Sequence, residues 1–158
     1  MTKLLLVCMG NICRSPMALA VARKLAEDAD LSPPLAFDSA GTHAPRIGER
    51  PDPRAAASLA RRGYQIGRGR SRRITQLDFE RFDLILGMDS RILVDLRRSC
   101  APEYLNKLHL FLDFSQEHHG TDVPDPYFGS VAGFDRVVEL CEAGARGLIK
   151  RHACAPRH

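Results

Sequence analysis

The stretch Cys8-Met9-Gly10-Asn11-Ile12-Cys13-Arg14-Ser15-Pro16 decides the fold that we predict for this chain. It follows a short apolar run at residues 3–7 and precedes helix-forming residues up to Ala22. This order predicts a strand, a tight loop and the N-terminus of a helix. Ser15 is a favoured N-cap residue and Pro16 suits the first helical position, so we expect the helix to begin at Pro16.

The predicted loop has the properties of an anion site. Gly10 and Asn11 tolerate the positive φ that a loop folding back on itself needs. Backbone N–H groups of such a loop can point inward, and the helix N-terminus adds partial positive charge. Arg14 supplies a planar fork for two phosphate oxygens, and positive surroundings favour the thiolate form of Cys8. We interpret Cys8 as a nucleophile beneath a bound phosphate; the alternative is a structural cysteine beside an arginine that caps another group.

Length and composition are typical of one soluble globular domain. The chain has 158 residues, of which 44% are hydrophobic and 27% charged, which suits a single domain with its own core. No stretch approaches the ~20 apolar residues of a membrane span, and we expect no signal peptide. The five cysteines show no C-x2-C spacing, which argues against a zinc site. We expect one cytoplasmic domain over residues 1–158, without metal or cofactor, because a reducing compartment suits a thiolate.

The rest of the chain alternates short apolar runs with helix signals. Further strands are predicted at residues 35–39, 82–88 and 107–112. Asp52, Thr75 and Asp89 are N-cap signals for three helices, and a last helix is predicted from Val131 to Lys150. This alternation predicts an α/β fold: a single three-layer domain with a four-stranded parallel sheet, helices on both faces and the phosphate-binding loop after the first strand. Ligands of such folds bind beyond the carboxyl ends of the strands.

A second motif is Pro124-Asp125-Pro126-Tyr127-Phe128, within a long predicted loop at residues 113–130. An alkoxide or phenolate leaving group needs a proton, and the flanking prolines would hold the Asp125 carboxyl in one direction. Tyr127 and Phe128 could stack on an aromatic leaving group. Spacing alone leaves open an ordinary Asp-Pro turn with surface aromatic residues.

Taken in order, these motifs resemble those of the low-molecular-weight protein tyrosine phosphatases, and of bacterial members in particular. The matching segments are residues 7–16, 38–42, 51–55, 82–89 and 125–128. The resemblance implies hydrolysis of phosphotyrosine in a protein substrate through a cysteinyl-phosphate on Cys8. Arg14 and the loop would hold the phosphate, and Asp125 would act as general acid and then base. The implied substrate-binding and phosphate-binding residues are Met9, Gly10, Asn11, Ile12, Cys13, Ser15, Tyr127 and Phe128.

The resemblance also implies supporting roles. Ser15 would donate a hydrogen bond to the Cys8 thiolate, and Asn11 would hold the loop through a hydrogen bond to Ser39. Cys13 would trap an oxidised Cys8 as a reversible disulfide.

Ile12 bears on the substrate. The family's protein-arginine phosphatases typically carry threonine at this position, so isoleucine favours phosphotyrosine, with phosphoarginine as the alternative. Simple packing of the loop would also explain the residue.

Three positions depart from the family pattern. Gly69 stands where members often carry a histidine that supports the loop asparagine, so that support is absent or comes from elsewhere. Pro45 lies where members often have an aromatic wall of the cleft, which leaves Tyr127 and Phe128 as the main aromatic walls. Ile92 replaces an asparagine common after the Met-Asp pair, and we expect a local effect.

Two further functions compete with this hypothesis. The basic run at residues 68–73 could bind nucleic acid, but it lacks interleaved aromatic residues. A solvated basic face, or attraction of an acidic phosphopeptide, explains the run as well. Thiol-dependent arsenate reduction would use a similar loop but needs additional cysteines, and Cys100 is isolated while Cys141 lies inside a predicted helix. The sequence names neither the substrate protein nor the oligomeric state.

Overall fold

A four-stranded parallel sheet forms the centre of the molecule, in a computed structural model that describes residues 1–154. The predicted domain extends to residue 158, and its last four residues lie outside the described part. The strand order is β2-β1-β3-β4 and every neighbouring pair is parallel. The strands are β1 (Thr2–Cys8), β2 (Leu35–Gly41), β3 (Leu84–Gly87) and β4 (Leu108–Leu110). The predicted α/β fold class is confirmed.

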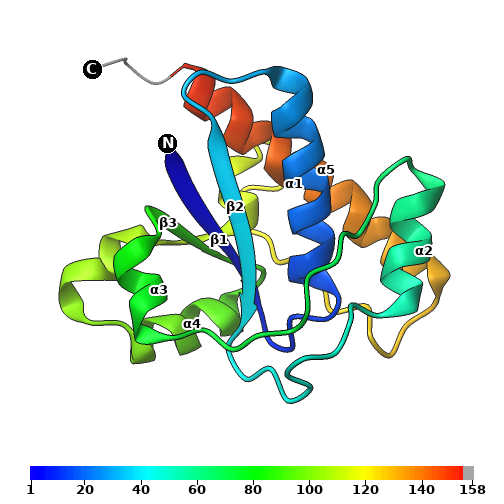
Figure 1. Cartoon of the computed structure of the whole chain (residues 1–158), viewed down its shortest axis with the longest axis horizontal. Coiled ribbons are helices and arrows are strands. Elements are labelled where there is room, and N and C mark those ends of the chain that lie inside the picture. Colours follow the sequence, from blue (N-terminus) through cyan, green and yellow to red (C-terminus); the bar gives the residue numbers. More distant parts are fainter. Residues whose placement is uncertain (155–158) are drawn as a thin grey trace.

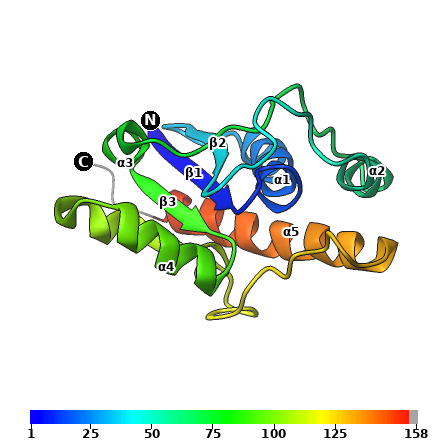
Figure 2. The same cartoon turned by 90° about the horizontal axis from the view of Figure 1, so that it is seen from below.

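Helices cover both faces of the sheet (Figure 1, Figure 2). One face carries α1 and α5, with α2 packed against α5 at the edge. The other face carries α3 and α4. The helices are α1 (Arg14–Ala29), α2 (Pro53–Arg61), α3 (Gln76–Arg81), α4 (Ser90–Ser99) and α5 (Val131–Ala153), with short 3-10 helices η1 (Pro102–Lys107) and η2 (Phe111–Phe114).

Strand β1 lies between two hydrophobic cores. Leu4 and Leu6 belong to the core shared with α1 and α5, whereas Leu5 and Val7 belong to the core shared with α3 and α4. Successive strand side chains point to opposite faces, so a strand covered on both faces is apolar throughout. Its last residue, Cys8, is therefore delivered to the carboxyl edge of the sheet from a fully packed strand.

Two glycines determine how closely α5 approaches η2. A Cβ atom on Gly147 would overlap the backbone of Phe114, and one on Gly144 would overlap the Phe111 ring. Because a backbone cannot move aside as a flexible side chain can, Gly147 is required for this packing. The short helix η2 is thereby packed closely against α5.

Several element boundaries differ from the predicted ones. Helix α1 begins at Arg14, so the prediction of Ser15 as its N-cap is wrong. The loop backbone enters the helix from Cys13, which leaves the Ser15 hydroxyl in the first turn to contact loop side chains. The fourth strand is only three residues long because the chain turns into η2 at Phe111.

The caps predicted for α2 and α4 are confirmed. Asp52 accepts a hydrogen bond from the Arg54 N–H, and Asp89 accepts one from the Ile92 N–H, each at 2.8 Å. Within residues 1–154, no helix combines the length and the apolar character needed to cross a membrane.

Candidate active site

The loop after β1 wraps around the thiol of Cys8. This segment, residues 8–15, is called the phosphate loop below. Its Asn11 N–H donates to Cys8 Sγ at 3.2 Å, and the Ser15 hydroxyl lies 3.0 Å from the same sulfur. Asn11 takes the left-handed conformation (φ 56°) that turns the loop back on itself. The arrangement places two hydrogen-bond donors beside the sulfur.

The direction of the Ser15 hydrogen bond follows from its other contact. Asn11 Nδ2 donates to Ser15 Oγ at 2.8 Å, so this oxygen already accepts a hydrogen bond. The remaining hydroxyl proton is free to point to Cys8. Ser15 is completely buried, so no water competes for that proton.

Asn11 and its neighbours form the support of the loop. Asn11 Nδ2 also donates to Ser39 Oγ at 2.9 Å, and Asn11 Oδ1 accepts from the Arg72 N–H at 2.9 Å. Ser71 Oγ donates to the Gly10 carbonyl at 2.9 Å. Because Gly69 has no side chain that could support the loop, this support comes from Ser71 and Arg72 instead.

The Gly10–Asn11 peptide is held from both sides. Its carbonyl accepts the Ser71 hydroxyl, while its N–H donates to Cys8 Sγ. The C=O and N–H of a trans peptide point in opposite directions. The Ser71 contact therefore aims the N–H into the cavity, toward the sulfur.

Arg14 joins the phosphate loop to two distant segments. The residue is 4% exposed; its Nη1 donates to Asp89 Oδ2 at 2.5 Å and to the Val123 carbonyl at 3.0 Å. Burial opposes the charge, but the hydrogen bond to Asp89 and nearby negative groups outweigh it, so the pKa of Arg14 is raised. The fork is fixed and charged before any ligand arrives. Sequence reasoning took Asp89 only as a helix cap and missed this contact.

Asp125 faces this arginine from the other side. Its Oδ2 lies 4.0 Å from Arg14 Nη2, and its Oδ1 accepts the Tyr127 N–H at 3.1 Å. The side chain is 46% exposed. Residues 122–128, called the acid loop below, are anchored where Val123 N–H donates to the Met88 carbonyl at 2.8 Å.

A cavity of about 230 Å³ lies between the two loops. Asn11, Ser15 and Ser39 do not line this cavity, and all three are buried. Sequence reasoning missed Arg46, for which the local sequence offered no signal beyond the neighbouring Pro45. The cavity is lined by Cys8, Met9, Gly10, Ile12, Cys13, Arg14, Pro45, Arg46, Asp125, Tyr127 and Phe128.

The aromatic pair on the acid loop is held unevenly. Arg46 Nη2 donates to the Tyr127 hydroxyl at 2.9 Å, and Arg54 Nη1 donates to the Tyr127 carbonyl at 2.9 Å. The Arg54 guanidinium also lies 5.3 Å from the centre of the Tyr127 ring. Phe128 contacts Tyr127 edge to face but is 96% exposed. One ring is a fixed wall, and the other is open to a ligand.

Cys13 lines the same cavity as Cys8, but its thiol lacks the acidity that a nucleophilic cysteine needs. Burial, together with the charges of Asp52 and other acidic groups, raises the pKa of Cys13 to about 12. Its thiol points to Asp52 Oδ2 at 3.9 Å. A hydrogen bond from Arg54 lowers the pKa of Asp52, which keeps that carboxylate ionised. Cys13 is therefore a thiol at neutral pH.

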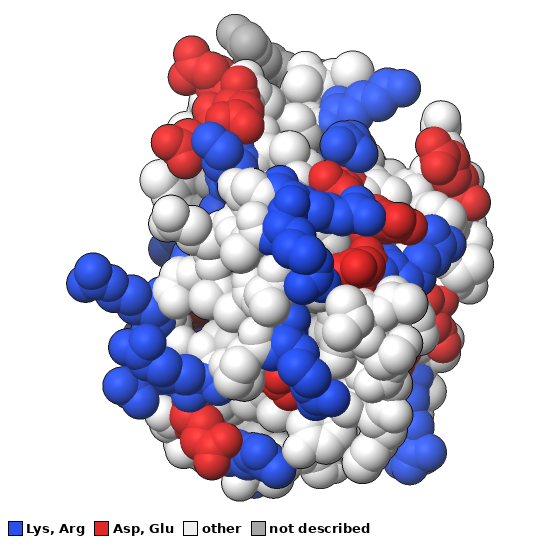
Figure 3. Space-filling view, turned by 90° about the vertical axis from the view of Figure 1, so that its right-hand side faces the viewer, with Lys and Arg blue, Asp and Glu red and all other residues white. Residues whose placement is uncertain are grey.

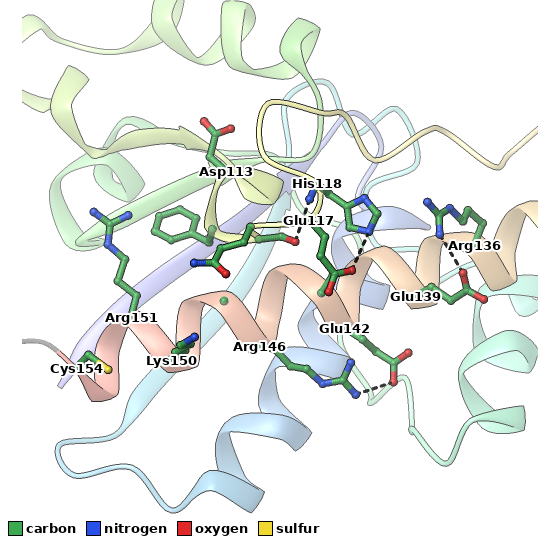
Figure 4. A pocket seen from close by; sticks show the side chains of 15 residues that line it. Asp113, Glu117, His118, Arg136, Glu139, Glu142, Arg146, Lys150, Arg151 and Cys154 are labelled. Carbon is green, nitrogen blue, oxygen red and sulfur yellow. Dashed lines mark hydrogen bonds and ion pairs between the residues drawn. The ribbon is translucent and has the colours of Figure 1, made fainter.

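A larger cavity, of about 800 Å³, lies elsewhere, between residues 113–118 and the outer face of α5 (Figure 4). Several of its charged side chains pair with one another: Arg136 with Glu139 at 3.1 Å and Arg146 with Glu142 at 3.7 Å. No phosphate-loop residue lines it. In the described chain, no group of three or more His, Cys, Asp or Glu side chains is arranged to hold a metal ion. The smaller cavity is the one that brings Cys8 and Arg14 together with Asp125.

Fold and site together define an enzyme that holds an anion over a cysteine nucleophile. A family model described as low molecular weight phosphotyrosine protein phosphatase matches residues 3–154. The low molecular weight protein-tyrosine-phosphatase of Streptomyces coelicolor is 42% identical over 146 residues, which cover 90% of this chain and 88% of the relative. This chain belongs to the low molecular weight phosphotyrosine protein phosphatase family, as the motifs predicted.

Solved structures agree with this assignment. A protein tyrosine phosphatase from Entamoeba histolytica, with Hepes in the active site, superposes with a TM-score of 0.91 at 38% identity, over 96% of each chain. The arginine phosphatase YwlE of Bacillus subtilis superposes with a TM-score of 0.85 at 27% identity, over 95% of each chain. Solved structures with this fold are therefore named as phosphatases of two different residues, tyrosine and arginine.

Proposed function

We propose that this protein hydrolyses phosphotyrosine in protein substrates through a cysteinyl-phosphate on Cys8. The observation that carries the proposal is the placement of Cys8 Sγ. It lies beneath a cavity, beside the Asn11 N–H and the Ser15 hydroxyl, with Arg14 and Asp125 on its walls. A thiolate, a guanidinium fork and a carboxyl group on one cavity meet the needs of phosphoryl transfer.

The first step forms the covalent intermediate. The phosphate oxygens bind the loop amides and Arg14, which Asp89 keeps in place. Cys8 Sγ attacks phosphorus as the bond to the tyrosine oxygen breaks, and protonated Asp125 gives its proton to the departing phenolate. The products of this step are tyrosine and a cysteinyl-phosphate.

The second step releases phosphate. A water molecule attacks phosphorus and transfers a proton to the Asp125 carboxylate, while the bond between phosphorus and Cys8 Sγ breaks. The electron pair returns to sulfur as the thiolate. The Ser15 hydroxyl and the Asn11 N–H stabilise that negative charge.

The cavity walls favour an aryl phosphate. Pro45, Ile12 and Tyr127 line the cavity with mainly apolar surface, and Phe128 stands exposed at its mouth. An aromatic leaving group buries apolar surface there. Ile12 brings no polar group for a guanidinium, which argues against phosphoarginine, the second candidate suggested by the likeness to YwlE.

A substrate comparison tests the proposal. Peptides of one sequence carrying phosphotyrosine, phosphoserine or phosphoarginine are compared by phosphate release, with Cys8→Ser as the control. We expect turnover of the phosphotyrosine peptide only, and none by the variant. Equal turnover of the phosphoarginine peptide would contradict the assigned substrate, and full activity of Cys8→Ser would contradict the mechanism.

The proposal includes redox protection of the nucleophile in a cytoplasmic, reducing environment. Cys8 and Cys13 line the same cavity, which supports capture of oxidised Cys8 by the Cys13 thiol. Peptide mapping after peroxide treatment tests this: a Cys8–Cys13 disulfide supports it, and a sulfonic acid on Cys8 beside an unmodified Cys13 contradicts it.

A further inference from the structure

The segment at residues 43–52 runs along the outside of the phosphate loop. Ala44 N–H donates to the Met9 carbonyl at 3.0 Å, and Asp52 N–H donates to the Ile12 carbonyl at 2.8 Å. Both ends of the segment are therefore tied to the loop that surrounds Cys8. Of the side chains between these two contacts, Pro45 and Arg46 line the active-site cavity.

A second basic segment pairs with the first. Gly48 N–H donates to the Ser71 carbonyl and Ser71 N–H donates to the Glu49 carbonyl, both at 2.8 Å. Arg70 Nη1 also donates to the Gly48 carbonyl at 3.0 Å. Residues 68–71 therefore lie against residues 46–50, whose Arg46 lines the active-site cavity. We call Arg46, Arg50, Arg68 and Arg70, all of them exposed, the arginine rim.

The charge of the arginine rim is largely uncompensated. Arg46 lies 3.7 Å from Glu49. Among residues 1–154, no carboxylate lies within 4.0 Å of the guanidinium of Arg50 or Arg70. Glu49 and Asp52 are the acidic residues in the two segments 43–52 and 66–71, and Asp52 is already paired with Arg54 at 2.8 Å. Positive charge without paired acids attracts anionic partners.

Other arginines that looked free in the sequence are used inside the protein. Arg61 pairs with Asp135 at 2.6 Å, and Arg62 pairs with Glu139 at 3.0 Å, which clamps α2 onto α5. Figure 3 shows this face, where basic and acidic side chains lie side by side. Arg72 pairs with Asp78 at 3.0 Å. The contrast leaves the arginine rim, of which Arg46 lines the cavity, as exposed basic surface beside the phosphate loop.

Apolar side chains accompany the rim. Met9 is 45% exposed, Ile47 is 65% exposed and Phe128 is 96% exposed. Met9 and Phe128 line the cavity, and Ile47 follows Arg46 directly. The surface around the mouth therefore combines positive charge with apolar contact area, which suits a peptide better than a uniformly charged polymer.

We propose that the arginine rim selects phosphotyrosine segments whose flanking residues are acidic. This inference rests on the proposed phosphatase function and names the class of substrate segment that the site takes. Glutamate or aspartate residues near the phosphotyrosine pair with the arginines, and an apolar residue beside them contacts Ile47. The basic run thereby serves the active site.

The test compares two phosphotyrosine peptides that differ only in flanking glutamates or glutamines. We expect kcat/KM to be about threefold to tenfold higher for the glutamate peptide, as one to a few exposed ion pairs would produce. The preference should lie in KM and should shrink as salt is added. p-Nitrophenyl phosphate, which has no flanking residues, serves as the reference substrate.

Two double variants locate the effect. Arg50→Gln with Arg70→Gln should bring the glutamate preference close to one, measured relative to p-nitrophenyl phosphate. Arg97→Gln with Arg98→Gln removes the same charge from the last turn of α4 and should keep the preference. Equal loss in both variants would mean that net charge alone acts, and would overturn the proposal.

The remaining outcomes separate the two proposals. Equal hydrolysis of both peptides by the unmodified enzyme overturns the selection of acidic segments and leaves the phosphatase function standing. Hydrolysis of neither peptide overturns the phosphatase function. Strong inhibition by a short single-stranded RNA, without inhibition by polyglutamate, assigns the arginine rim to nucleic acid and overturns the proposal.

Discussion

The phosphate loop and the acid loop face each other across one cavity but are held in different ways. The phosphate loop is fixed by buried side chains: Asn11 and Ser15 are at most 2% exposed, and each takes part in hydrogen bonds between side chains. On the acid loop, the side chain of Asp125 is 46% exposed and Phe128 is 96% exposed. The difference separates two tasks. The nucleophile and the phosphate are placed by a buried hydrogen-bond network, while the leaving group meets a wall that is largely open to solvent.

Of the changes considered for the two loops, removing the Asp125 carboxyl from the acid loop should lower the rate of hydrolysis most. Asp125→Ala should slow hydrolysis of alkyl phosphates and poor phenolate leaving groups by about 10²-fold to 10⁴-fold, the usual contribution of a general acid. Good leaving groups such as p-nitrophenolate should be affected far less. Rates for a series of aryl phosphates measure this, and equal slowing across the series would exclude Asp125 as the acid.

A smaller effect on catalysis is expected from a change on the side of the phosphate loop, at Ser71. Ser71→Ala frees the Gly10 carbonyl, so the Asn11 N–H is aimed less firmly at Cys8. Removing one hydrogen bond costs about 1 kcal/mol, so kcat should fall about fivefold.

Ser58→Ala is the matched control for Ser71→Ala, because Ser58 is equally buried but contacts Arg61 instead of the phosphate loop. Ser58→Ala should leave kcat unchanged. Ser71→Thr, which keeps the hydroxyl, should have the kcat of the unmodified enzyme. A loss of melting temperature without a loss of kcat in Ser71→Ala would show that Ser71 only stabilises the fold.

Replacing Asp78, which lies behind the phosphate loop, should have the smallest effect on catalysis. It should, however, change how the stability of the protein depends on pH. Burial opposes ionisation there, but hydrogen bonds from Arg72 and Thr75 prevail, so the pKa of Asp78 is lowered. A lowered pKa in the folded state adds stability above the unfolded-state pKa of about 4, and that stability is lost as the pH falls through the folded value.

Asp78→Asn should therefore lower the free energy of unfolding by about 1.5–3 kcal/mol at pH 7, and by less as the pH drops below about 4. Urea unfolding at several pH values measures the difference. Asp28→Asn, at an exposed pair with Lys24, is the control. A difference from the unmodified protein that grows on acidification would contradict the direction of the pKa shift.

Much of the fold and of the phosphate loop could be predicted because the signals are local. The apolar run of β1, the loop from Cys8 to Arg14 and the caps at Asp52 and Asp89 each occupy a few neighbouring residues. Their chemistry depends on short-range geometry. The Pro-Asp-Pro motif pointed to Asp125, and the family resemblance added its role as general acid and base. The resemblance also added the Asn11–Ser39 pair, whose members lie far apart in the chain.

The missed features depend on contacts between distant segments. Ser71 reaches Gly10, and Arg72 uses Asp38 and Asp78, so part of the basic run is consumed inside the protein. Arg46 reaches the cavity only because its segment lies along the phosphate loop. Ser15 was misassigned as a cap because its hydroxyl serves Cys8 rather than the helix end. Side-chain partners of this kind follow from the tertiary fold and leave no local pattern.

One guanidinium connects the three loops at the carboxyl edge of the sheet. Arg14 belongs to the first loop, Asp89 to the corner after β3, and the Val123 carbonyl to the acid loop. An anion that binds this arginine recognises a site that exists only when all three are assembled. Bound phosphate thus acts as a reporter of folding: at a hundred times its Kd it would add about 2.7 kcal/mol to the free energy of unfolding. Binding of an anion at Arg14 and the free energy of unfolding of the domain are therefore linked, because both depend on the same three contacting segments.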